Sequence, residues 1–177
     1  MREMPMFVLV GPSASGKSTV AQVLVEQLGM KWAVTTTTRK RRRWEPVDAY
    51  HFVSKESFRV DDMVESQEYA GNYYGLSKAE ADGSNLVILE PKGAVALRSY
   101  CGARGCYVVG SPVSRRAQAE RMVMRGDSAK VINERIACDA VAFQNFERIC
   151  DTVCFADTVE ELCAVIKEYI NAHTLTQ

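Results

Sequence analysis

The stretch VGPSASGKSTV, residues Val10 to Val20, decides the fold of this chain. Its glycines, lysine and serine match the Walker A pattern, Gly11-x-x-x-x-Gly16-Lys17-Ser18. An apolar run precedes the motif and a helical pattern follows it, which is the strand, loop and helix context that the pattern requires. Such a loop turns backbone N–H groups inward and, with the helix N-terminus, cradles phosphate oxygens.

The motif predicts a nucleoside triphosphate as ligand, and MgATP is the one we expect. Lys17 would neutralise the outer phosphates, and Ser18 would place its hydroxyl on Mg²⁺. The alternative is a glycine-rich turn that binds nothing. The ATP-binding residues that the motif predicts are Gly11, Ser13, Ala14, Ser15, Gly16, Lys17, Ser18 and Thr19.

Length and composition indicate a single globular domain. The chain has 177 residues, of which 47% are hydrophobic and 25% charged, as in ordinary globular proteins. Lys plus Arg and Asp plus Glu both number 22, so a diffuse nucleic-acid-binding surface is not indicated. The six cysteines lack CxxC pairing and zinc-ligand spacing, which favours reduced core thiols over disulfides or a metal site.

The sequence also bears on location. The N-terminal MREMPMFVLVG has only a short apolar run and no small-residue cleavage site. No later segment approaches the roughly 18 apolar residues of a membrane span. We therefore expect a cytoplasmic protein with no membrane partner, either a monomer or a homodimer.

Apolar runs alternate with helical patterns, which is typical of a parallel sheet flanked by helices. Between residues 37 and 74 the pattern changes to short pieces with several aromatic residues, which predicts an inserted subdomain of small strands. The fold class is therefore α/β, a three-layer α/β/α domain with two inserts. The expected core strands are 6–10, 32–37, 85–90, 105–110 and 152–155, and the expected helices are 17–28, one opening at Pro91, 114–124, 128–148 and 158–171.

Two further groups of cations are candidates to surround a transferred phosphoryl group. The run 39–43, RKRRR, follows an expected strand and thus lies near the sheet edge where open α/β folds bind ligands. Arg121, Arg125 and Arg135 lie on two expected helices, which could form a lid that closes over the triphosphate. By spacing alone, Arg121 and Arg125 could instead belong to a solvent-exposed i,i+4 helix face. The basic run could instead be a solvated or RNA-contacting surface.

Several motifs together resemble guanylate kinase, the nucleoside monophosphate kinase that moves a phosphate from ATP to GMP. They run in the family's order over nearly the whole chain. The resemblance implies a P-loop core (1–34, 84–120 and 137–177), a monophosphate-binding insert (about 35–83) and an arginine-bearing lid (about 121–136). The matching pieces are GPSASGKST (11–19), TTTTRKRR (35–42), YHFVS (50–54), GNYYG (71–75), ILEPKGA (88–94) and ERMVMRGDSAKVINERI (120–136).

The resemblance also assigns roles to residues. It places the lid arginine Arg121 near the adenine of ATP. It implies that Lys17, Arg39, Arg125 and Arg135 are catalytic and surround the moving phosphoryl group. It implies that the acceptor phosphate is bound by Arg39, Arg42, Tyr50 and Tyr74. It implies that the guanine base is bound by Thr35, Glu65, Glu90 and Ser77.

Glu65 is the residue that we expect to select the base. A carboxylate accepts from guanine N1–H and the exocyclic amine together, and adenine offers no such donor pair. The family's D-x-D is reduced here to Ile88-x-Glu90, and its adenine-side Asn is Ala156. Glu65 and the resemblance predict GMP or dGMP as the acceptor, while the first of these two departures weakens the prediction of base selectivity. A modified purine nucleotide or several deoxynucleoside monophosphates remain alternatives, as does a guanylate-kinase-like interaction module without catalysis.

Overall fold

The computed structural model describes residues 4–41, 43, 45–69 and 71–174. Its core is a four-stranded sheet in the order β6-β1-β7-β8, and every neighbouring pair is parallel. These strands are β1 (Met6–Val10), β6 (Leu86–Ile88), β7 (Cys106–Gly110) and β8 (Thr152–Val153).

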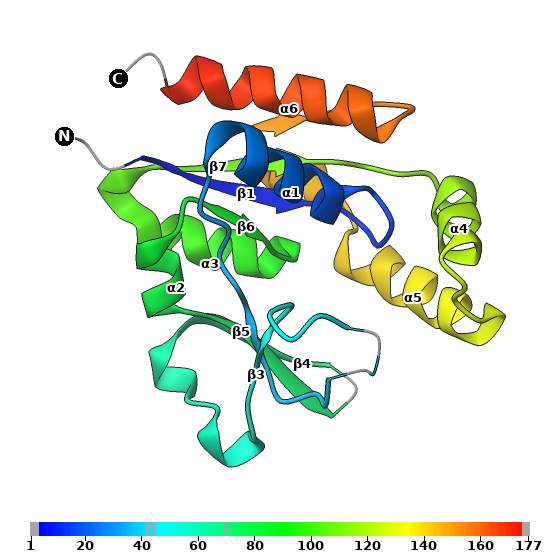
Figure 1. The fold of residues 1–177 in the computed structure, drawn as a ribbon, viewed down its shortest axis with the longest axis horizontal. Helices are drawn as coiled ribbons and strands as arrows, with labels where there is room; N and C mark the ends of the chain where they lie inside the picture. The colour runs from blue at the N-terminus through cyan, green and yellow to red at the C-terminus, as the bar shows by residue number, and fades with distance from the viewer. Residues whose placement is uncertain (1–3, 42, 44, 70, 175–177) are drawn as a thin grey trace.

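Helices cover both faces of this sheet (Figure 1). Side chains alternate across a strand, so Phe7 and Leu9 pack on one side of β1, against α1 and α6, while Met6 and Val8 pack on the other side. The fold class predicted from the sequence is confirmed. The helices on the first side are α1 (Lys17–Leu28) and α6 (Val159–Thr174), and those on the second are α2 (Lys78–Gly83) and α3 (Pro91–Cys101).

A second, smaller sheet forms the predicted insert. Its order is β3-β2-β5-β4, with β2 and β3 parallel and the other pairs antiparallel. The small strands are those that the sequence pattern of this region predicts, and two 3₁₀ turns that it does not predict lie between them. The elements are β2 (Thr36–Thr37), β3 (His51–Phe52), the turns Lys55–Ser57 and Val60–Asp62, β4 (Met63–Tyr69) and β5 (Asn72–Ser77).

A pair of connected helices, α4 (Arg115–Met124) and α5 (Ala129–Ala142), completes the fold beside the P-loop (Figure 1). Ser114 and Ser128 cap them by accepting a backbone N–H three residues on. Two further 3₁₀ turns, Gly102–Arg104 and Phe146–Ile149, lie outside these helices. The predicted starts of both helices are confirmed within one residue.

Two predicted elements are wrong. No continuous core strand spans 32–37, because Trp32 only bridges Leu86 of the core sheet and the chain then crosses to the second sheet, where Thr36–Thr37 form β2. The helix expected at 128–148 ends at Ala142. The chain turns at Asn145, whose φ is 54°, and thereby buries Phe146 in the core. Helical periodicity does not reveal such a turn, because it records spacing and not the direction of the chain.

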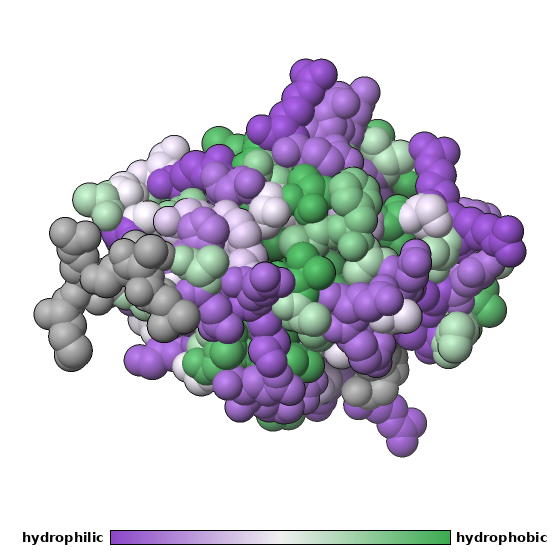
Figure 2. Space-filling model, turned by 90° about the horizontal axis from the view of Figure 1, so that it is seen from above, coloured by the Kyte–Doolittle hydropathy of each residue, from purple (hydrophilic) through white to green (hydrophobic). Residues whose placement is uncertain are grey.

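The six cysteines are free thiols. Cys154 and Cys163 are buried, as expected, whereas Cys138 is exposed on α5 and the prediction of a core position for it is wrong. None of the described helices is both long and apolar enough to cross a membrane. Seen from above, the surface over α6 mixes hydrophobic residues with a majority of hydrophilic ones (Figure 2).

The packing of α1 on the sheet gives a first prediction. Leu24 is fully buried among the residues of α1, α6 and β1, so Leu24→Ala is expected to lower the free energy of unfolding by about 3 kcal/mol. Chemical denaturation measures this loss. The matched control is Val165→Ala on α6, where the side chain is 43% exposed and the change is expected to stay below about 0.5 kcal/mol. Equal losses in both variants would contradict the core assignment.

Candidate nucleotide site

The P-loop joins β1 to α1 at the carboxyl edge of the core sheet, as the motif predicts (Figure 1). Gly11 is required sterically, because a Cβ there would lie 2.3 Å from the Ser111 carbonyl oxygen. Gly16 has a φ of 94°, which a side chain rarely tolerates. Ala14 also has a positive φ, 58°, without being glycine. Ser18 and Thr19 lie exposed on the first turn of α1.

Lys17 lies inside the loop. Its Nζ donates to the Pro12 carbonyl oxygen at 2.7 Å and to Ser15 Oγ at 3.0 Å. Burial lowers the pKa of Lys17 to about 8, while the carboxylates of Asp139 and Glu90 act in the opposite direction. A lysine held at this position presents its charge to an anion in the loop.

The predicted lid arginines are placed differently from one another. Arg121 on α4 donates from Nη1 to the Ala14 carbonyl oxygen at 3.0 Å, so it contacts the P-loop directly. Arg125 follows α4 and pairs with Asp127 at 3.6 Å, and its charge reaches Lys17. Arg135 is half-buried on α5. The solvated-face alternative is therefore wrong for Arg121, which is bound to the loop.

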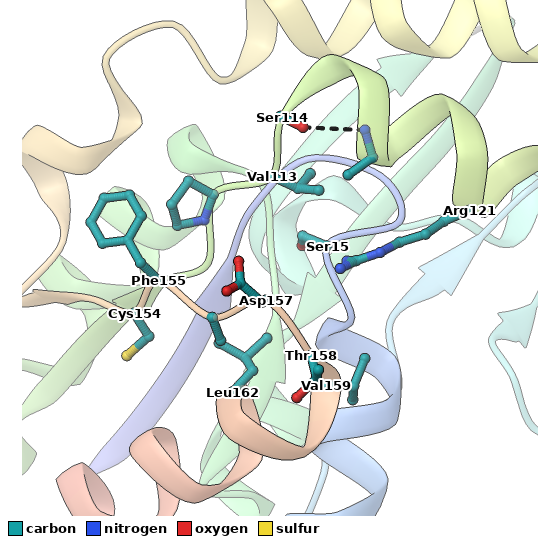
Figure 3. A pocket seen from close by; sticks show the side chains of 13 residues that line it. Ser15, Val113, Ser114, Arg121, Cys154, Phe155, Asp157, Thr158, Val159 and Leu162 are labelled. Atoms are coloured by element: carbon teal, nitrogen blue, oxygen red, sulfur yellow. Dashed lines mark hydrogen bonds between the residues drawn. The ribbon is translucent and has the colours of Figure 1, made fainter.

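A cavity of about 260 Å³ opens beside Arg121 and Ser15 (Figure 3). Its walls come from the P-loop, the connection between β7 and α4, and the segment before α6. The lining combines apolar side chains with a few polar ones, which is typical of a site for an aromatic base. The lining includes Phe155, Asp157 and Leu162.

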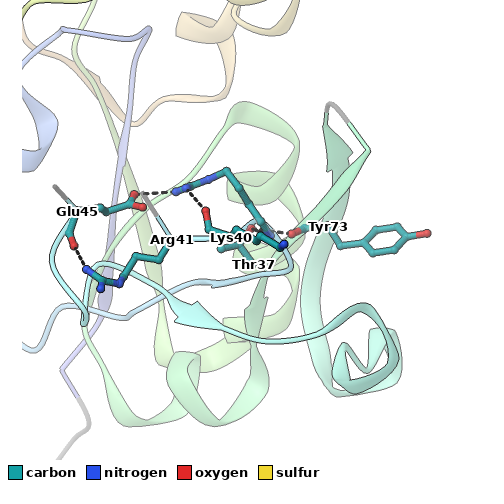
Figure 4. A network of polar contacts seen from close by, with 6 residues as sticks. Thr37, Lys40, Arg41, Glu45 and Tyr73 are labelled. Atoms are coloured by element: carbon teal, nitrogen blue, oxygen red, sulfur yellow. Dashed lines mark hydrogen bonds and ion pairs between the residues drawn. The ribbon is translucent and has the colours of Figure 1, made fainter. Parts of the chain in front are cut away.

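The second sheet brings the predicted acceptor residues together. The Arg39 guanidinium lies over the Tyr50 ring at 5.6 Å and hydrogen-bonds with the side chain of Tyr74. The two tyrosine rings meet edge to face at 6.3 Å. Arg39 Nη2 also pairs with Glu45 Oε1 at 2.7 Å, and the Glu45 backbone carbonyl accepts from Arg41 (Figure 4). Arg42, the remaining predicted acceptor residue, lies outside the described residues.

The predicted base-reading residues lie on the neighbouring strands. Thr35 precedes β2, and its carbonyl oxygen accepts from the His51 backbone. Ser77 ends β5 and caps α2. Glu65 on β4 packs against Gly93, where a Cβ would lie 3.1 Å from the Glu65 carboxyl. The absence of a side chain at Gly93 therefore leaves room for that carboxyl.

Glu65 and Glu90 form an acidic pair. Burial, and then the charge of Glu90, raises the pKa of Glu65 to about 7. Burial also raises the pKa of Glu90, although this residue keeps an exposed surface at the start of α3, and a hydrogen bond from Gln67 opposes the rise. Because Glu90 also acts on Lys17, the acidic pair lies between the second sheet and the P-loop.

The acidic pair gives a prediction for pH dependence. A group with a pKa of about 7 loses its negative charge as the pH falls through 7. If the ionised Glu65 carboxylate accepts hydrogen bonds from the base, the KM for GMP is expected to rise about tenfold between pH 8 and pH 6, in inverse proportion to the ionised fraction of Glu65. Steady-state kinetics at fixed MgATP measures it. A flat KM profile for wild type, or an unchanged profile in Glu65→Gln, would contradict the assignment.

Two polar residues of the site escape prediction from the sequence. Asp139 on α5 accepts from the Ser13 backbone N–H at 2.8 Å. It lies four residues after Arg135 and thus on the same helix face, which is the one signal that could have found it. Glu45, the partner of Arg39, lies two residues after the basic run 39–43 and belongs to no recognisable motif.

Comparisons with known proteins agree with this geometry. The family model described as Guanylate kinase matches residues 3–173. A guanylate kinase of Chlorobaculum tepidum is 36% identical over 145 residues, 74% of this chain and 74% of that protein. One of Brucella melitensis is 31% identical over 185 residues, 96% of this chain and 83% of that protein. The crystal structure of guanylate kinase from Anaplasma phagocytophilum superposes with a TM-score of 0.73 at 23% identity, covering 98% of this chain and 88% of that one.

Proposed function

This chain belongs to the guanylate kinase family, and from that premise we propose which of its residues bind the two nucleotides and carry the transfer. As a member of the family, the chain is a nucleoside monophosphate kinase that phosphorylates GMP with ATP. The observation that supports our residue assignment best is the cation set around the P-loop. Lys17 lies in the loop, and the lid helix places Arg121 against it.

We assign the triphosphate to the P-loop and the adenine to the 260 Å³ cavity beside it. The backbone of residues 11–19 would hold the phosphates, with Lys17 near the outer ones. The exposed Phe155 ring and the apolar Leu162 side chain offer the base stacking and packing surfaces, and Asp157 lies at the same cavity. Arg121 would lie between the base and the phosphates.

We assign the acceptor phosphate to Arg39, Arg42, Tyr50 and Tyr74. Arg39 already engages an anion in this structure, the carboxylate of Glu45. A phosphate dianion carries more charge and more acceptor oxygens than a carboxylate. It would therefore compete for the guanidinium, with the phenol groups of the two tyrosines as further donors.

We assign the base of the acceptor to Glu65, with Thr35, Ser77 and Glu90 as further polar contacts. Ionised Glu65 presents two oxygens, which suits the two adjacent donors of guanine. The cost of ionising a carboxyl in this partly desolvated place is offset when guanine supplies hydrogen bonds to it. A base without that donor pair would leave the carboxylate unsatisfied and bind more weakly.

The reaction does not require a general base. The attacking group is an acceptor phosphate oxygen that is already anionic at neutral pH, so positioning and charge neutralisation supply most of the acceleration. Lys17, Arg39, Arg125 and Arg135 would supply positive charge around the transferred group. The lid helices α4 and α5 would exclude water as they close.

We propose Mg²⁺ as the metal of the reaction. The Ser18 hydroxyl lies exposed on the first turn of α1 beside the phosphate loop. One protein oxygen fits this ion, which binds proteins through few ligands and takes the rest from phosphates and water. Bound Mg²⁺ neutralises charge on the donor phosphates.

The division into a core, a monophosphate-binding insert at about 35–83 and a lid at about 121–136 is part of the proposal. The second sheet supports the insert, and the contacts of α4 and α5 with the P-loop support the lid. The cytoplasmic location and the choice between monomer and homodimer stay predictions. The reduction to Ile88-x-Glu90 keeps dGMP, a modified purine nucleotide and several deoxynucleoside monophosphates as alternative acceptors.

A panel of acceptors tests the function. ADP release, measured in a coupled assay with MgATP and each of the common NMPs and dNMPs, is expected to be fastest with GMP or dGMP. A preference for another base would overturn the guanine assignment. No turnover with any acceptor would favour the interaction module, which binds a partner and lacks catalysis. RNA binding through the basic run would instead give an affinity that falls steeply with salt concentration.

A further inference from the structure

We propose that Asp139 is a positioning residue that, with Gln118 and Arg121, clamps the P-loop in the conformation that receives the triphosphate. The inference rests on the proposed binding of MgATP at this loop. It adds a residue that the motifs of the sequence do not include, and it assigns Arg121 a task in addition to contact with the nucleotide.

The clamp consists of two contacts from the lid helices to adjacent residues of the loop. Asp139 Oδ2, on α5, accepts from the Ser13 N–H at 2.8 Å. Arg121 Nη1, on α4, donates to the Ala14 carbonyl oxygen at 3.0 Å. The two bonds therefore hold the peptide groups on either side of the Ser13–Ala14 pair, one as a donor and the other as an acceptor.

A buried amide orients the Asp139 carboxylate. Gln118 on α4 is only 3% exposed, and its Nε2 donates to the same Asp139 Oδ2 that accepts from Ser13. The three groups form a chain from α4 through α5 to the loop. A buried amide that donates to a carboxylate restricts the rotation of that carboxylate, so Gln118 maintains the direction in which Asp139 meets the loop.

The loop needs such a clamp because of Ala14. Its φ of 58° lies in the left-handed region, which an alanine side chain disfavours. An isolated loop with alanine at this position would therefore favour other conformations. The bonds on the Ser13 N–H and the Ala14 carbonyl act on the residue with the disfavoured backbone and hold it in place.

The same carboxylate also carries a negative charge close to the phosphate loop, as its effect on Lys17 indicates. That charge alone would oppose the binding of a triphosphate. The hydrogen bonds of Asp139 favour the binding of a triphosphate and its charge opposes it. Variants of Asp139 separate these two effects. Asparagine keeps an oxygen that accepts both hydrogen bonds and removes the charge, whereas alanine removes the bonds and the charge together.

Calorimetric titration of the protein with MgATP, in the absence of GMP, tests the clamp directly. Asp139→Ala is expected to raise the Kd for MgATP roughly tenfold, because the loop is no longer held ready for the ligand. Asp139→Asn is expected to stay within about twofold of wild type, since both bonds persist. The matched control is Glu134→Ala on the same helix, whose carboxylate pairs only weakly with Lys130 at 4.0 Å. It is expected to leave the Kd unchanged.

A second alteration tests the role of Ala14. Glycine adopts the left-handed conformation readily, so Ala14→Gly is expected to restore most of the affinity that Asp139→Ala loses. A merely structural role of Asp139 would give no such rescue. In the kinase assay the loss is expected in the KM for ATP, with the KM for GMP unchanged.

Three results would overturn the clamp. They are an unchanged Kd in Asp139→Ala, tighter MgATP binding in both Asp139 variants, and no rescue by Ala14→Gly. Thermal denaturation establishes that each variant is folded. If Asp139→Ala does not fold, Gln118→Met removes one donor to the carboxylate at similar volume and is expected to raise the Kd about threefold. An unchanged Kd there would overturn the clamp as well. Failure of wild type to turn over any acceptor would overturn the proposed function and leave the MgATP titrations interpretable.

Discussion

Replacing Lys17 by methionine is expected to lower kcat with MgATP and GMP by about three orders of magnitude, since phosphoryl transfer depends chiefly on charge stabilisation in the transition state. The Lys17 amino group is held inside the loop by the Pro12 carbonyl and Ser15 Oγ. Methionine has a similar length and no charge, so the loop keeps a side chain there while the cation is lost. The coupled assay of ADP release measures the effect.

The control for this variant is Lys31→Met. Lys31 is exposed beyond the end of α1, and its loss is expected to change kcat by less than about twofold, as for a surface substitution. Thermal denaturation of both variants separates loss of chemistry from loss of fold. A Lys17→Met enzyme that keeps a tenth or more of the wild-type kcat would contradict the role that we assign to this cation.

Replacing Glu65 by glutamine is expected to lower kcat/KM for GMP about a hundredfold and to leave the KM for MgATP unchanged. In our proposal the Glu65 carboxylate accepts hydrogen bonds from two donors of guanine. Glutamine has one acceptor oxygen, and its NH₂ group would face a donor of the base. The partly buried site would then contain two hydrogen-bond donors facing each other, which costs more than the loss of one hydrogen bond.

The fold of the Glu65→Gln variant is not expected to suffer. Burial raises the pKa of Glu65 to about 7, above the value of about 4.3 expected in an unfolded chain. The folded protein thus binds the proton more tightly, and ionisation of Glu65 reduces stability as the pH rises from about 4 to 7. At pH 8 the neutral glutamine avoids this cost, so the Tm of the variant is expected to equal or exceed that of wild type.

Glu68→Gln on the same strand provides the matched control, because Glu68 is exposed and no base contact is assigned to it. Its kcat/KM for GMP is expected to stay within about twofold of wild type. If Glu65→Gln instead raises the KM values for GMP and MgATP by equal factors, Glu65 does not read the base. The result would then place the selectivity with Glu90 or with the polar residues of β5.

Local sequence patterns were sufficient to predict the core strand and helix on either side of the P-loop. The strand Met6–Val10 and the helix Lys17–Leu28 lie at their predicted bounds, because a buried strand, a glycine-rich turn and an amphipathic helix each have a short-range signature. The strand expected at 32–37 failed for the opposite reason. An apolar and β-branched run predicts an extended chain, but not which of two sheets it joins.

The sequence by itself determined that this chain has a phosphate-binding loop, a parallel α/β core and the ordered motifs of the guanylate kinase family, because each of these depends on residues close together in the chain. Only the tertiary structure decided that Glu45 pairs with Arg39, that burial and the charge of Glu90 raise the pKa of Glu65, and that Asp139 holds Ser13. Ser13 and Asp139 are 126 positions apart. The strength and direction of such contacts depend on distance and burial, which no local pattern of residues specifies.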